Sequence, residues 1–313
     1  MGTHNDRIRL GIVGLGKIAV DQHIPAIGRL DAFELVAAAD RRPSNGPVPV
    51  YGDMAAMLAA HPDIRAVSLC TPPQVRFDLA CDAISRGLHV FLEKPPAMTM
   101  GQARTLDALS KSSGGSIFTA WHSRFSPAVA RAAGWVADHA IKTVNIAWKE
   151  NVRKWHPGQT WIFEAGGMGV FDPGINGLSI LTAIVPGTLL VDQAVLHVPE
   201  NVKAPIQAEL EMHAAGGARI YAEFDFLQEH GETWSIDIWA HDGGRLRLEN
   251  GGALLSIDGA PVPMAPEAEY LGLYTRFLDL IRMGRSELDF EPLRIVADAM
   301  LVGDQRSVAA YYE

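Results

Sequence analysis

The segment that most constrains the fold lies near the N-terminus, where a short apolar stretch runs directly into a glycine-rich turn. Residues 9–13 have the composition of a buried strand, and Gly14, Gly16 and Ala19 follow it in the spacing Gly-x-Gly-x-x-Ala. The first glycine permits a tight turn, the second lets the backbone approach a pyrophosphate, and the alanine lets the next helix pack closely on the sheet. This order of strand, turn and helix predicts a dinucleotide-binding βαβ unit.

Strand and helix patterns continue to alternate through the first third of the chain. The expected strands are 33–39, 66–70, 89–92 and 116–120, and the expected helices are 54–60, 75–86 and 101–112. Strands separated by helices form parallel sheets through right-handed crossovers. We therefore expect an α/β domain over residues 1–125, with a Rossmann-type, doubly wound parallel sheet.

Asp40 follows the second predicted strand, about where the ribose-binding acid of such a domain belongs. A carboxylate there accepts hydrogen bonds from the 2′- and 3′-hydroxyls and repels a 2′-phosphate, so it favours NAD over NADP. Arg41 and Arg42 follow at once and weaken that preference, which leaves NADP as a second possibility. The alternative is that Asp40 is only a turn residue at the end of a strand.

After residue 125 the pattern changes to longer strands with hairpin turns. The expected strands are 143–148, 218–226, 233–240, 244–249 and 254–257, and the expected helices are 126–139, 176–184, 267–283 and 293–311. Three dipeptides among these strands are typical of tight hairpins: Asp242-Gly243, Asn250-Gly251 and Asp258-Gly259. We expect an α+β domain over 126–313 with a large, mostly antiparallel open sheet, and a C-terminal helix able to pack back on the first domain.

Composition narrows the functional classes. At 313 residues the chain exceeds one hydrophobic core, and 48% hydrophobic with 20% charged residues is typical of a soluble globular protein. A net charge of −9 argues against a nucleic-acid partner. The two cysteines, Cys70 and Cys81, form no disulfide framework, and no stretch is typical of a signal peptide or a membrane span. We expect a cytoplasmic protein with no membrane partner.

A second distinctive segment, at 148–176, reads WKENVRKWHPGQTWIFEAGGMGVFDPGIN. Indole rings alternating with carboxylates, amides and cations suit the wall of a pocket for a small, hydroxyl-rich ligand. Glu150 is a candidate hydroxyl acceptor at a sheet end, with a solvated surface position as the alternative. Trp155 and His156 are expected in a loop that forms the pocket wall. Trp234 and Trp239, on one predicted strand, are expected to face opposite sides.

Two motifs in the chain resemble the glucose–fructose oxidoreductase / inositol dehydrogenase family (Gfo/Idh/MocA). They are Glu93-Lys94-Pro95 and the glycine-rich element 166–172, which ends in Asp172. The resemblance implies NAD(P)-dependent oxidation of a sugar or polyol, with nicotinamide and substrate meeting between the domains and the lysine reaching the reacting carbon. It also implies a homodimer or homotetramer formed through the open face of the C-terminal sheet.

The chain departs from the usual family motif at one position, because Asn176 stands where a histidine is expected. Asparagine does not carry a proton at neutral pH, so proton transfer is expected to fall on Lys94, Asp172 or both. Asn176 and Trp155-His156-Pro157 most closely resemble the aldose 1-dehydrogenase branch of the family. That resemblance implies oxidation of C1 of an aldopyranose, D-galactose or L-arabinose, to the aldonolactone.

The resulting hypothesis names three groups of site residues and no metal. The catalytic candidates are Lys94 and Asp172, with a helix N-cap as the alternative role of Asp172. The substrate-binding candidates are His122, Glu150, Trp155, His156, Asn176 and Trp234. The cofactor-binding candidates are Gly14, Gly16, Lys17, Ile18, Asp40, Arg41, Thr71, Glu93 and Lys94. Two other functions stay open: a polyol or inositol dehydrogenase acting at a ring carbon, and a non-catalytic NAD-binding regulator.

Overall fold

A computed structural model of the chain describes residues 7–42, 46–266 and 268–312 and divides it into two compact units. The first unit runs to Ala120 and also contains Tyr270–Phe290, whereas the second contains Trp121–Glu269 and the residues from Glu291 onward. The sequence predicts a single domain boundary after residue 125 and a C-terminal helix able to pack back on the first domain. In the structure the returning segment is 270–290, because its helix buries aromatic side chains in the first unit.

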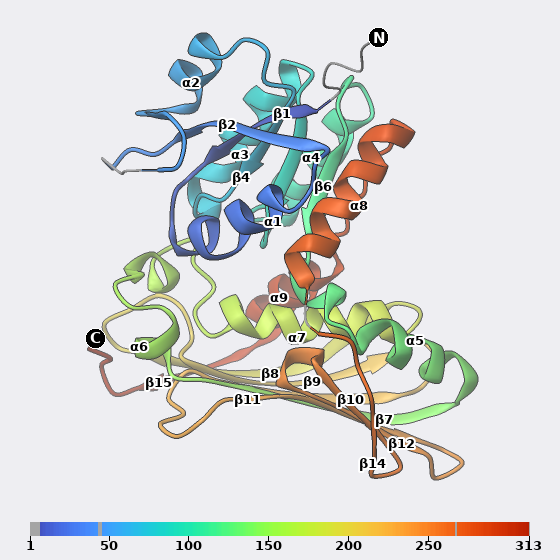
Figure 1. The fold of residues 1–313 in the computed structure, drawn as a ribbon. Coiled ribbons are helices and arrows are strands. Elements are labelled where there is room, and N and C mark those ends of the chain that lie inside the picture. Colours follow the sequence, from blue (N-terminus) through green and yellow to red (C-terminus); the bar gives the residue numbers. More distant parts are fainter. Residues whose placement is uncertain (1–6, 43–45, 267, 313) are drawn as a thin grey trace. The chain divides into compact units, whose positions relative to one another are not determined.

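The first unit is built on a six-stranded parallel sheet in the order β3-β2-β1-β4-β5-β6 (Figure 1). Its strands are β1 (Ile8–Val13), β2 (Phe33–Ala39), β3 (Val50–Tyr51), β4 (Ala66–Leu69), β5 (His89–Glu93) and β6 (Ile117–Ala120). This is the strand order of a doubly wound Rossmann sheet. The predicted fold class of the N-terminal domain is confirmed.

Some helices of the first unit begin at a side chain that caps them, and others are held by apolar side chains that pack in the first unit. They are a π-helical turn, η1 (Ala19–His23), followed by α1 (Ile24–Gly28), α2 (Met54–Ala60), α3 (Pro73–Ser85), α4 (Met100–Ser110) and α8 (Glu269–Met283). Asp53 accepts a hydrogen bond of 2.7 Å from Ala56 N and so caps α2. On α8, Phe277 contacts the rings of Phe33 and Phe91, which explains why this helix belongs to the first unit.

The second unit contains a nine-stranded sheet in the order β14-β13-β12-β11-β7-β10-β9-β8-β15. The strands are β7 (Ile141–Lys149), β8 (Leu189–Pro199), β9 (Gln207–Ala214), β10 (Arg219–Asp225), β11 (Thr233–Ala240), β12 (Arg245–Glu249), β13 (Leu254–Ile257), β14 (Ala260–Val262) and β15 (Asp304–Val308). Only the pairs β7–β10 and β8–β15 are parallel among the described strands of this sheet. The predicted mostly antiparallel sheet is therefore confirmed.

Two of the predicted hairpin dipeptides adopt the backbone conformation that tight turns require. Both residues of Asn250-Gly251 have positive φ angles, 49° and 68°, and so do both residues of Asp258-Gly259, at 51° and 80°. Asparagine, aspartate and glycine tolerate this left-handed region, which is why these dipeptides predict hairpins. They connect β12 to β13 and β13 to β14.

Helices cover one face of the second sheet and leave the other open (Figure 1). These helices and helical turns are η2 (His122–Phe125), α5 (Val129–Asp138), α6 (Val152–Trp155), η3 (Thr160–Phe163), α7 (Phe171–Ile184), η4 (Asn250–Gly252) and α9 (Glu291–Val302). Residues of β10 alternate strictly between exposed and buried, as expected for a strand with one solvated face. Among the described residues, no helix is both long and apolar enough to cross a bilayer.

Several elements of the second unit differ from the sequence prediction. Strands β8 and β9 were not predicted, although β9 has the alternating burial of a half-exposed strand. The helix expected over 293–311 ends at Val302, and Asp304–Val308 forms β15 because it pairs in parallel with β8. Helix α7 begins at Phe171 rather than 176, which places Asp172 in its first turn.

Candidate active site

The glycine-rich turn of the first unit has one side packed against protein and one side open. Gly14 has a φ angle of 94°, and a Cβ atom there would lie 3.0 Å from the carbonyl carbon of Cys70 and from the amide nitrogen of Thr71. A Cβ atom at Gly16 would meet no atom within 4 Å. Thr71 Oγ1 is buried and has no hydrogen-bond partner in the described structure. An open glycine turn beside an unsatisfied hydroxyl fits a bound dinucleotide.

Asp40, predicted to contact the ribose, also fixes this turn. Its Oδ2 accepts a hydrogen bond of 2.8 Å from Leu15 N, and its Oδ1 accepts one of 2.8 Å from Arg42 N. A carboxylate has further lone pairs, so ribose hydroxyls can still be accepted. Of the other candidates near the turn, Arg41 is exposed, Ile18 is 38% exposed and Lys17 forms an ion pair with Asp21.

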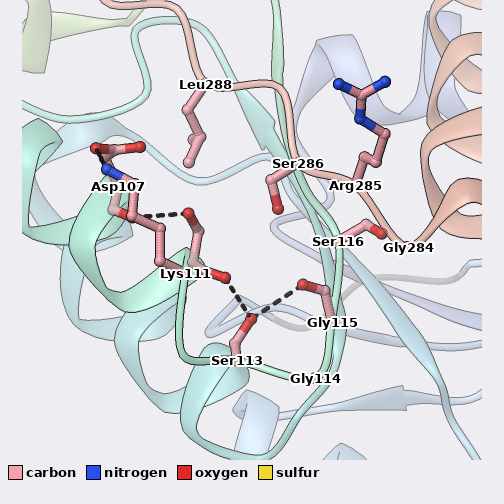
Figure 2. A pocket seen from close by; sticks show the side chains of 11 residues that line it. Asp107, Lys111, Ser113, Gly114, Gly115, Ser116, Gly284, Arg285, Ser286 and Leu288 are labelled. Atoms are coloured by element: carbon pink, nitrogen blue, oxygen red, sulfur yellow. Dashed lines mark hydrogen bonds and ion pairs between the residues drawn. The ribbon is translucent and has the colours of Figure 1, made fainter.

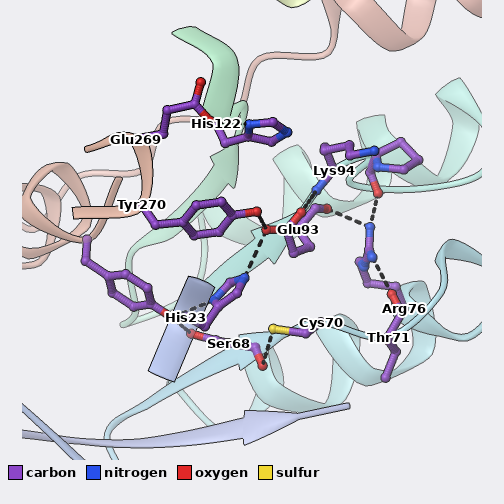
Figure 3. Close-up of polar contacts among 12 residues, drawn as sticks. His23, Ser68, Cys70, Thr71, Arg76, Glu93, Lys94, His122, Glu269 and Tyr270 are labelled. Carbon is purple, nitrogen blue, oxygen red and sulfur yellow. Dashed lines mark hydrogen bonds and ion pairs between the residues drawn. The ribbon is translucent and has the colours of Figure 1, made fainter. Parts of the chain in front are cut away.

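Glu93, one of the predicted cofactor-binding residues, is the centre of a buried polar network (Figure 3). Its Oε1 accepts hydrogen bonds from His23 Nε2 at 3.0 Å and from the Tyr270 hydroxyl at 2.8 Å. The other carboxylate oxygen, Oε2, accepts from Lys94 N at 2.9 Å. Glu93 therefore holds the backbone of the predicted catalytic lysine.

The same network extends behind His23 to strand β4. Because His23 Nε2 donates to Glu93, the neutral ring accepts at Nδ1, which lies 2.7 Å from the Tyr274 hydroxyl. The Tyr274 oxygen in turn lies 2.8 Å from Ser68 Oγ. Burial raises the pKa of the Tyr274 phenol well above its ordinary value, so the hydroxyl remains a neutral donor.

Lys94 itself is partly buried and follows the last residue of β5. The Lys94–Pro95 peptide bond is cis. The buried guanidinium of Arg76 secures the backbone on either side, because its Nη1 donates to Glu93 O at 2.6 Å and also to Pro95 O. The second terminal nitrogen, Nη2, donates to Thr71 O, which joins the lysine segment to the end of β4.

A cavity of about 390 Å³ in the first unit lies away from these motifs (Figure 2). Lys111, Arg285 and several serine and glycine residues line it. Ser113 Oγ, which lies in the cavity wall, donates to the backbone oxygens of Ser110 and Gly115. None of the predicted site residues lines this cavity, so cavity volume alone does not locate the site.

In the second unit, helix α7 presents Asp172 and Asn176 on one face, since they are four residues apart. Asp172 is buried and Asn176 is partly buried. The opposite face uses glycines to approach the sheet: a Cβ atom at Gly174 would lie 2.6 Å from a ring carbon of Phe224. Close packing thus fixes the helix that carries the two candidates. Asp172 lies inside the helix, so it is not the N-cap, which is Val170.

Glu150, which is buried, and His156, which is partly buried, form a pair beside Asp172. Glu150 is 3% exposed, and its oxygens accept from His156 Nε2 at 3.1 Å and from Trp234 Nε1 at 2.9 Å. His156 Nδ1 lies 3.9 Å from Asp172 Oδ2. The structure therefore brings four predicted residues together and shows that Glu150 orients two of the others.

Three indole rings form a cluster that joins this pair through the hydrogen bond from Trp234 to Glu150. The Trp234 ring lies 5.2 Å from that of Trp155 and 6.2 Å from that of Trp148, measured between centroids. A loop was expected at Trp155, but this residue is the last of the short helix α6. Asn151 caps the start of α6, because its side chain accepts a hydrogen bond from Arg153 N. Trp155 Nε1 donates to Glu232 at 3.0 Å, and hydrogen bonds from Lys154 and Trp155 lower the pKa of Glu232.

His122, the remaining substrate-binding candidate, lies in η2 of the same unit. Its Nδ1 is 2.6 Å from Glu269 Oε2, and the other oxygen of Glu269 accepts from Ser126. This contact with Glu269 fixes the orientation of the His122 ring. Sequence reasoning missed Glu269, as it missed His23, Tyr270 and Glu232, because each partner is distant along the chain and no local motif marks it.

Within the described ranges, no group of three or more His, Cys, Asp or Glu side chains is arranged to hold a metal ion. The polar residues of both units instead form hydrogen-bonded networks around Lys94 and around His156. Such networks hold side chains in fixed positions for chemistry on a bound ligand.

The Rossmann sheet, the glycine turn and the anchored lysine define a dinucleotide-dependent oxidoreductase. A sequence profile of an oxidoreductase family with an NAD-binding Rossmann fold, Gfo/Idh/MocA, matches residues 8–120. The chain belongs to the Gfo/Idh/MocA family, since it is also 45% identical over 306 residues to a galactose 1-dehydrogenase of Pseudomonas fluorescens. That alignment covers 98% of this chain and 99% of the relative.

Solved structures agree over the whole chain. The crystal structure of a D-galactose-1-dehydrogenase from Rhizobium etli is 46% identical, has a TM-score of 0.93, and the match covers 100% of both chains. A 3-ketoreductase from Actinomadura kijaniata has a TM-score of 0.84 at 18% identity, covering 96% of this chain and 99% of that one, and shows a shared fold. A D-glucoside 3-dehydrogenase of Escherichia coli (strain K12) is 34% identical over 128 residues, covering 38% of this chain and 36% of the relative.

Proposed function

We propose that the protein is an NAD(P)-dependent aldose 1-dehydrogenase that oxidises C1 of an aldopyranose, D-galactose or L-arabinose, to the aldonolactone. The observation that carries the proposal is its similarity along nearly the whole chain to a galactose 1-dehydrogenase. The neighbouring rings of Trp155 and Trp234, together with His156 beside Asp172, support it, because indole faces and polar side chains suit the two faces of a pyranose.

Each residue of the cluster has a defined part in this reaction. When bound, NAD or NADP supplies the nicotinamide that accepts a hydride from C1. Asp172 takes the proton of the C1 hydroxyl, with Lys94 as the second proton-handling group. Trp155 and Trp234 cover the C–H face of the sugar, while Asn176 orients a hydroxyl without exchanging a proton. Fixed positions of these groups supply most of the rate advantage, since they hold the reacting atoms together.

D-Galactose and L-arabinose share the hydroxyl arrangement of the pyranose ring and differ by the exocyclic CH₂OH. Steric exclusion of so small a group is worth about 1–3 kcal/mol, so we expect the kcat/KM values of the two sugars to differ by less than about 200-fold. A panel of aldoses and myo-inositol, assayed with NAD and with NADP, tests the proposal. Turnover of myo-inositol without turnover of any aldose would instead favour a polyol dehydrogenase.

Lys94→Ala separates an enzyme from a non-catalytic NAD-binding regulator. The enzyme proposal expects turnover to fall by at least about 100-fold, the effect of removing a proton-transfer group. Nucleotide affinity, measured by titration calorimetry, should persist because the glycine turn and Asp40 are unchanged. Full activity in Lys94→Ala would contradict the catalytic role of the lysine.

The cofactor preference is proposed to follow from Asp40. Asp40→Ser removes the carboxylate that Leu15 N and Arg42 N contact. Loss of one charge-assisted hydrogen bond, about 1.5–3 kcal/mol, predicts an NAD affinity about 10- to 100-fold weaker, with NADP less affected. An equal loss for both nucleotides would show that Asp40 supports the turn without discriminating between them.

We further propose a homodimer or homotetramer that forms through the open face of the second sheet. That face carries partly exposed apolar side chains, with Tyr221 39% and Leu190 46% exposed. Light scattering on the wild type and on Tyr221→Arg measures the assembly, and the substitution should shift it toward the monomer.

The free thiols of Cys70 and Cys81 fit the proposed cytoplasmic location.

A further inference from the structure

Two carboxylates in the second unit lie on either side of one imidazole ring. Glu150 Oε1 is 3.1 Å from His156 Nε2, and Asp172 Oδ2 is 3.9 Å from His156 Nδ1. Both carboxylates are at least 96% buried, with exposed fractions of 3% and 4%. Phe226 packs against the ring of His156 with centroids 5.5 Å apart. Glu150 and Asp172 are the titratable groups that the described structure places against this ring.

The contact between Glu150 and His156 fixes the tautomer of the His156 ring. An ionised carboxylate only accepts hydrogen bonds, and the second oxygen of Glu150 already accepts from Trp234 Nε1 at 2.9 Å. The hydrogen of a neutral His156 ring therefore lies on Nε2, directed at Glu150. The other ring nitrogen, Nδ1, presents a lone pair toward Asp172.

On the side that faces Asp172, the lone pair of His156 Nδ1 accepts no hydrogen bond from the described residues. His156 Nδ1 is buried and has no hydrogen-bond partner in the described part of the chain. At 3.9 Å from Asp172 Oδ2 it lies beyond hydrogen-bond length, and both atoms are acceptors. Two buried acceptors facing one another are costly unless a proton or a donor hydroxyl lies between them. The gap is thus a position for a proton.

We propose that His156 receives the proton that Asp172 takes from the sugar, and that Glu150 is the positioning residue that prepares His156 to receive it. The inference rests on the proposed function. It also assigns Glu150, expected from the sequence to accept a sugar hydroxyl, to the support of His156. Asn176, on the same face of α7 as Asp172, cannot accept this proton.

C1 loses the electron pair of its C–H bond as a hydride to the bound nicotinamide, and its hydroxyl loses the proton to Asp172, so the C1–O bond becomes a carbonyl. The proton then passes from Asp172 to His156 Nδ1, and Glu150 stabilises the resulting imidazolium through Nε2. The pair closes to hydrogen-bond length in the substrate complex, as catalytic contacts often do. This transfer restores the Asp172 carboxylate, and the proton leaves His156 for solvent after product release, which returns the imidazole ring to its neutral form.

Two substitutions test the two halves of the proposal. His156→Ala removes the acceptor, and we expect kcat to fall about 100- to 10,000-fold with a partial recovery on addition of free imidazole. Glu150→Gln presents an amide N–H to His156 Nε2 and so reverses the tautomer, placing the hydrogen on Nδ1. We expect kcat to fall by a similar factor, with KM changed by less than about threefold.

A matched control is available on the same unit, where His197 Nε2 lies 3.3 Å from Glu209 Oε1 at the exposed surface. His197→Ala should leave kcat unchanged with and without imidazole. Circular dichroism and nucleotide binding check that each variant folds.

Two results would overturn the proton transfer to His156 while the proposed function stands. One is wild-type oxidation of an aldose with His156→Ala or Glu150→Gln retaining kcat within about threefold. The other is a folded His156→Ala with low kcat that imidazole does not raise, which indicates a binding role only. A wild type that oxidises no aldose with either nucleotide refutes the proposed function itself.

Discussion

Substitution of Glu93 by glutamine tests whether the buried network of the first unit positions Lys94. The carboxylate of Glu93 accepts hydrogen bonds from His23 Nε2, the Tyr270 hydroxyl and Lys94 N. A glutamine has one acceptor oxygen. If that oxygen keeps the two bonds made by Oε1, the amide NH₂ faces Lys94 N–H, and two donors then oppose each other in a buried site.

The expected cost follows from these contacts. One charge-assisted hydrogen bond is lost and one buried donor is left unsatisfied, which together cost about 2–4 kcal/mol. The same energy corresponds to an increase of about 30- to 1,000-fold in the local opening constant. We also expect kcat to fall, because the backbone amide of the lysine loses its anchor.

Hydrogen exchange followed by mass spectrometry measures this opening in peptides that cover β5 and α8. Glu34→Gln is the control, since Glu34 pairs with Arg9 at a partly exposed site, where the pair contributes about 0.2–1 kcal/mol. Unchanged exchange at β5 and α8 in Glu93→Gln, together with wild-type kcat, would refute the positioning role of the network.

Two further predictions concern packing and pH. Gly174→Ala places a methyl group 2.6 Å from a ring carbon of Phe224, so the free energy of unfolding measured with denaturant should fall by about 1–3 kcal/mol, and kcat should fall as well. Gly134→Ala is the control, since a Cβ atom there meets no atom within 4 Å and the substitution should be neutral or stabilising. Burial lowers the pKa of His89, whose Nδ1 accepts from Ser116 N at 2.9 Å. The unfolded chain therefore binds more protons, and stability should be complete above about pH 6.5 and fall as the pH drops below it. His89→Asn, which keeps an acceptor for Ser116 N, should reduce this acid loss, and an unaltered pH dependence of the melting temperature would contradict the assignment.

The sequence predicts most of the fold because its signals are local. The Gly14-x-Gly16 turn between a strand and a helix identifies the Rossmann sheet, and Asn250-Gly251 and Asp258-Gly259 identify hairpins through their tolerance of positive φ. Strand β9 carries an alternating signal that sequence reasoning overlooked. The strand character of β15 depends on its pairing with β8, more than a hundred residues away, and no local pattern reveals it.

The site was less predictable because its partners are distant in sequence. The Glu93-Lys94-Pro95 motif draws attention to Glu93, but no local pattern reveals that its carboxylate contacts Tyr270, 177 residues away. The aromatic segment at 148–176 contains both Glu150 and His156, which the structure pairs. Their pairing depends on burial and on Trp234, which lies 84 residues from Glu150. Residue types thus predict candidate groups for the site, whereas burial and long-range pairing determine which side chain contacts which.

The central claim is that the enzyme removes hydrogen from C1 of an aldopyranose. D-Galactose carrying deuterium at C1, incubated with the protein and NAD or NADP, tests it most directly. The account predicts that mass spectrometry finds the deuterium in the reduced nucleotide and that the sugar becomes the lactone. Reduced nucleotide without deuterium, or turnover of myo-inositol with none of D-galactose or L-arabinose, would contradict it.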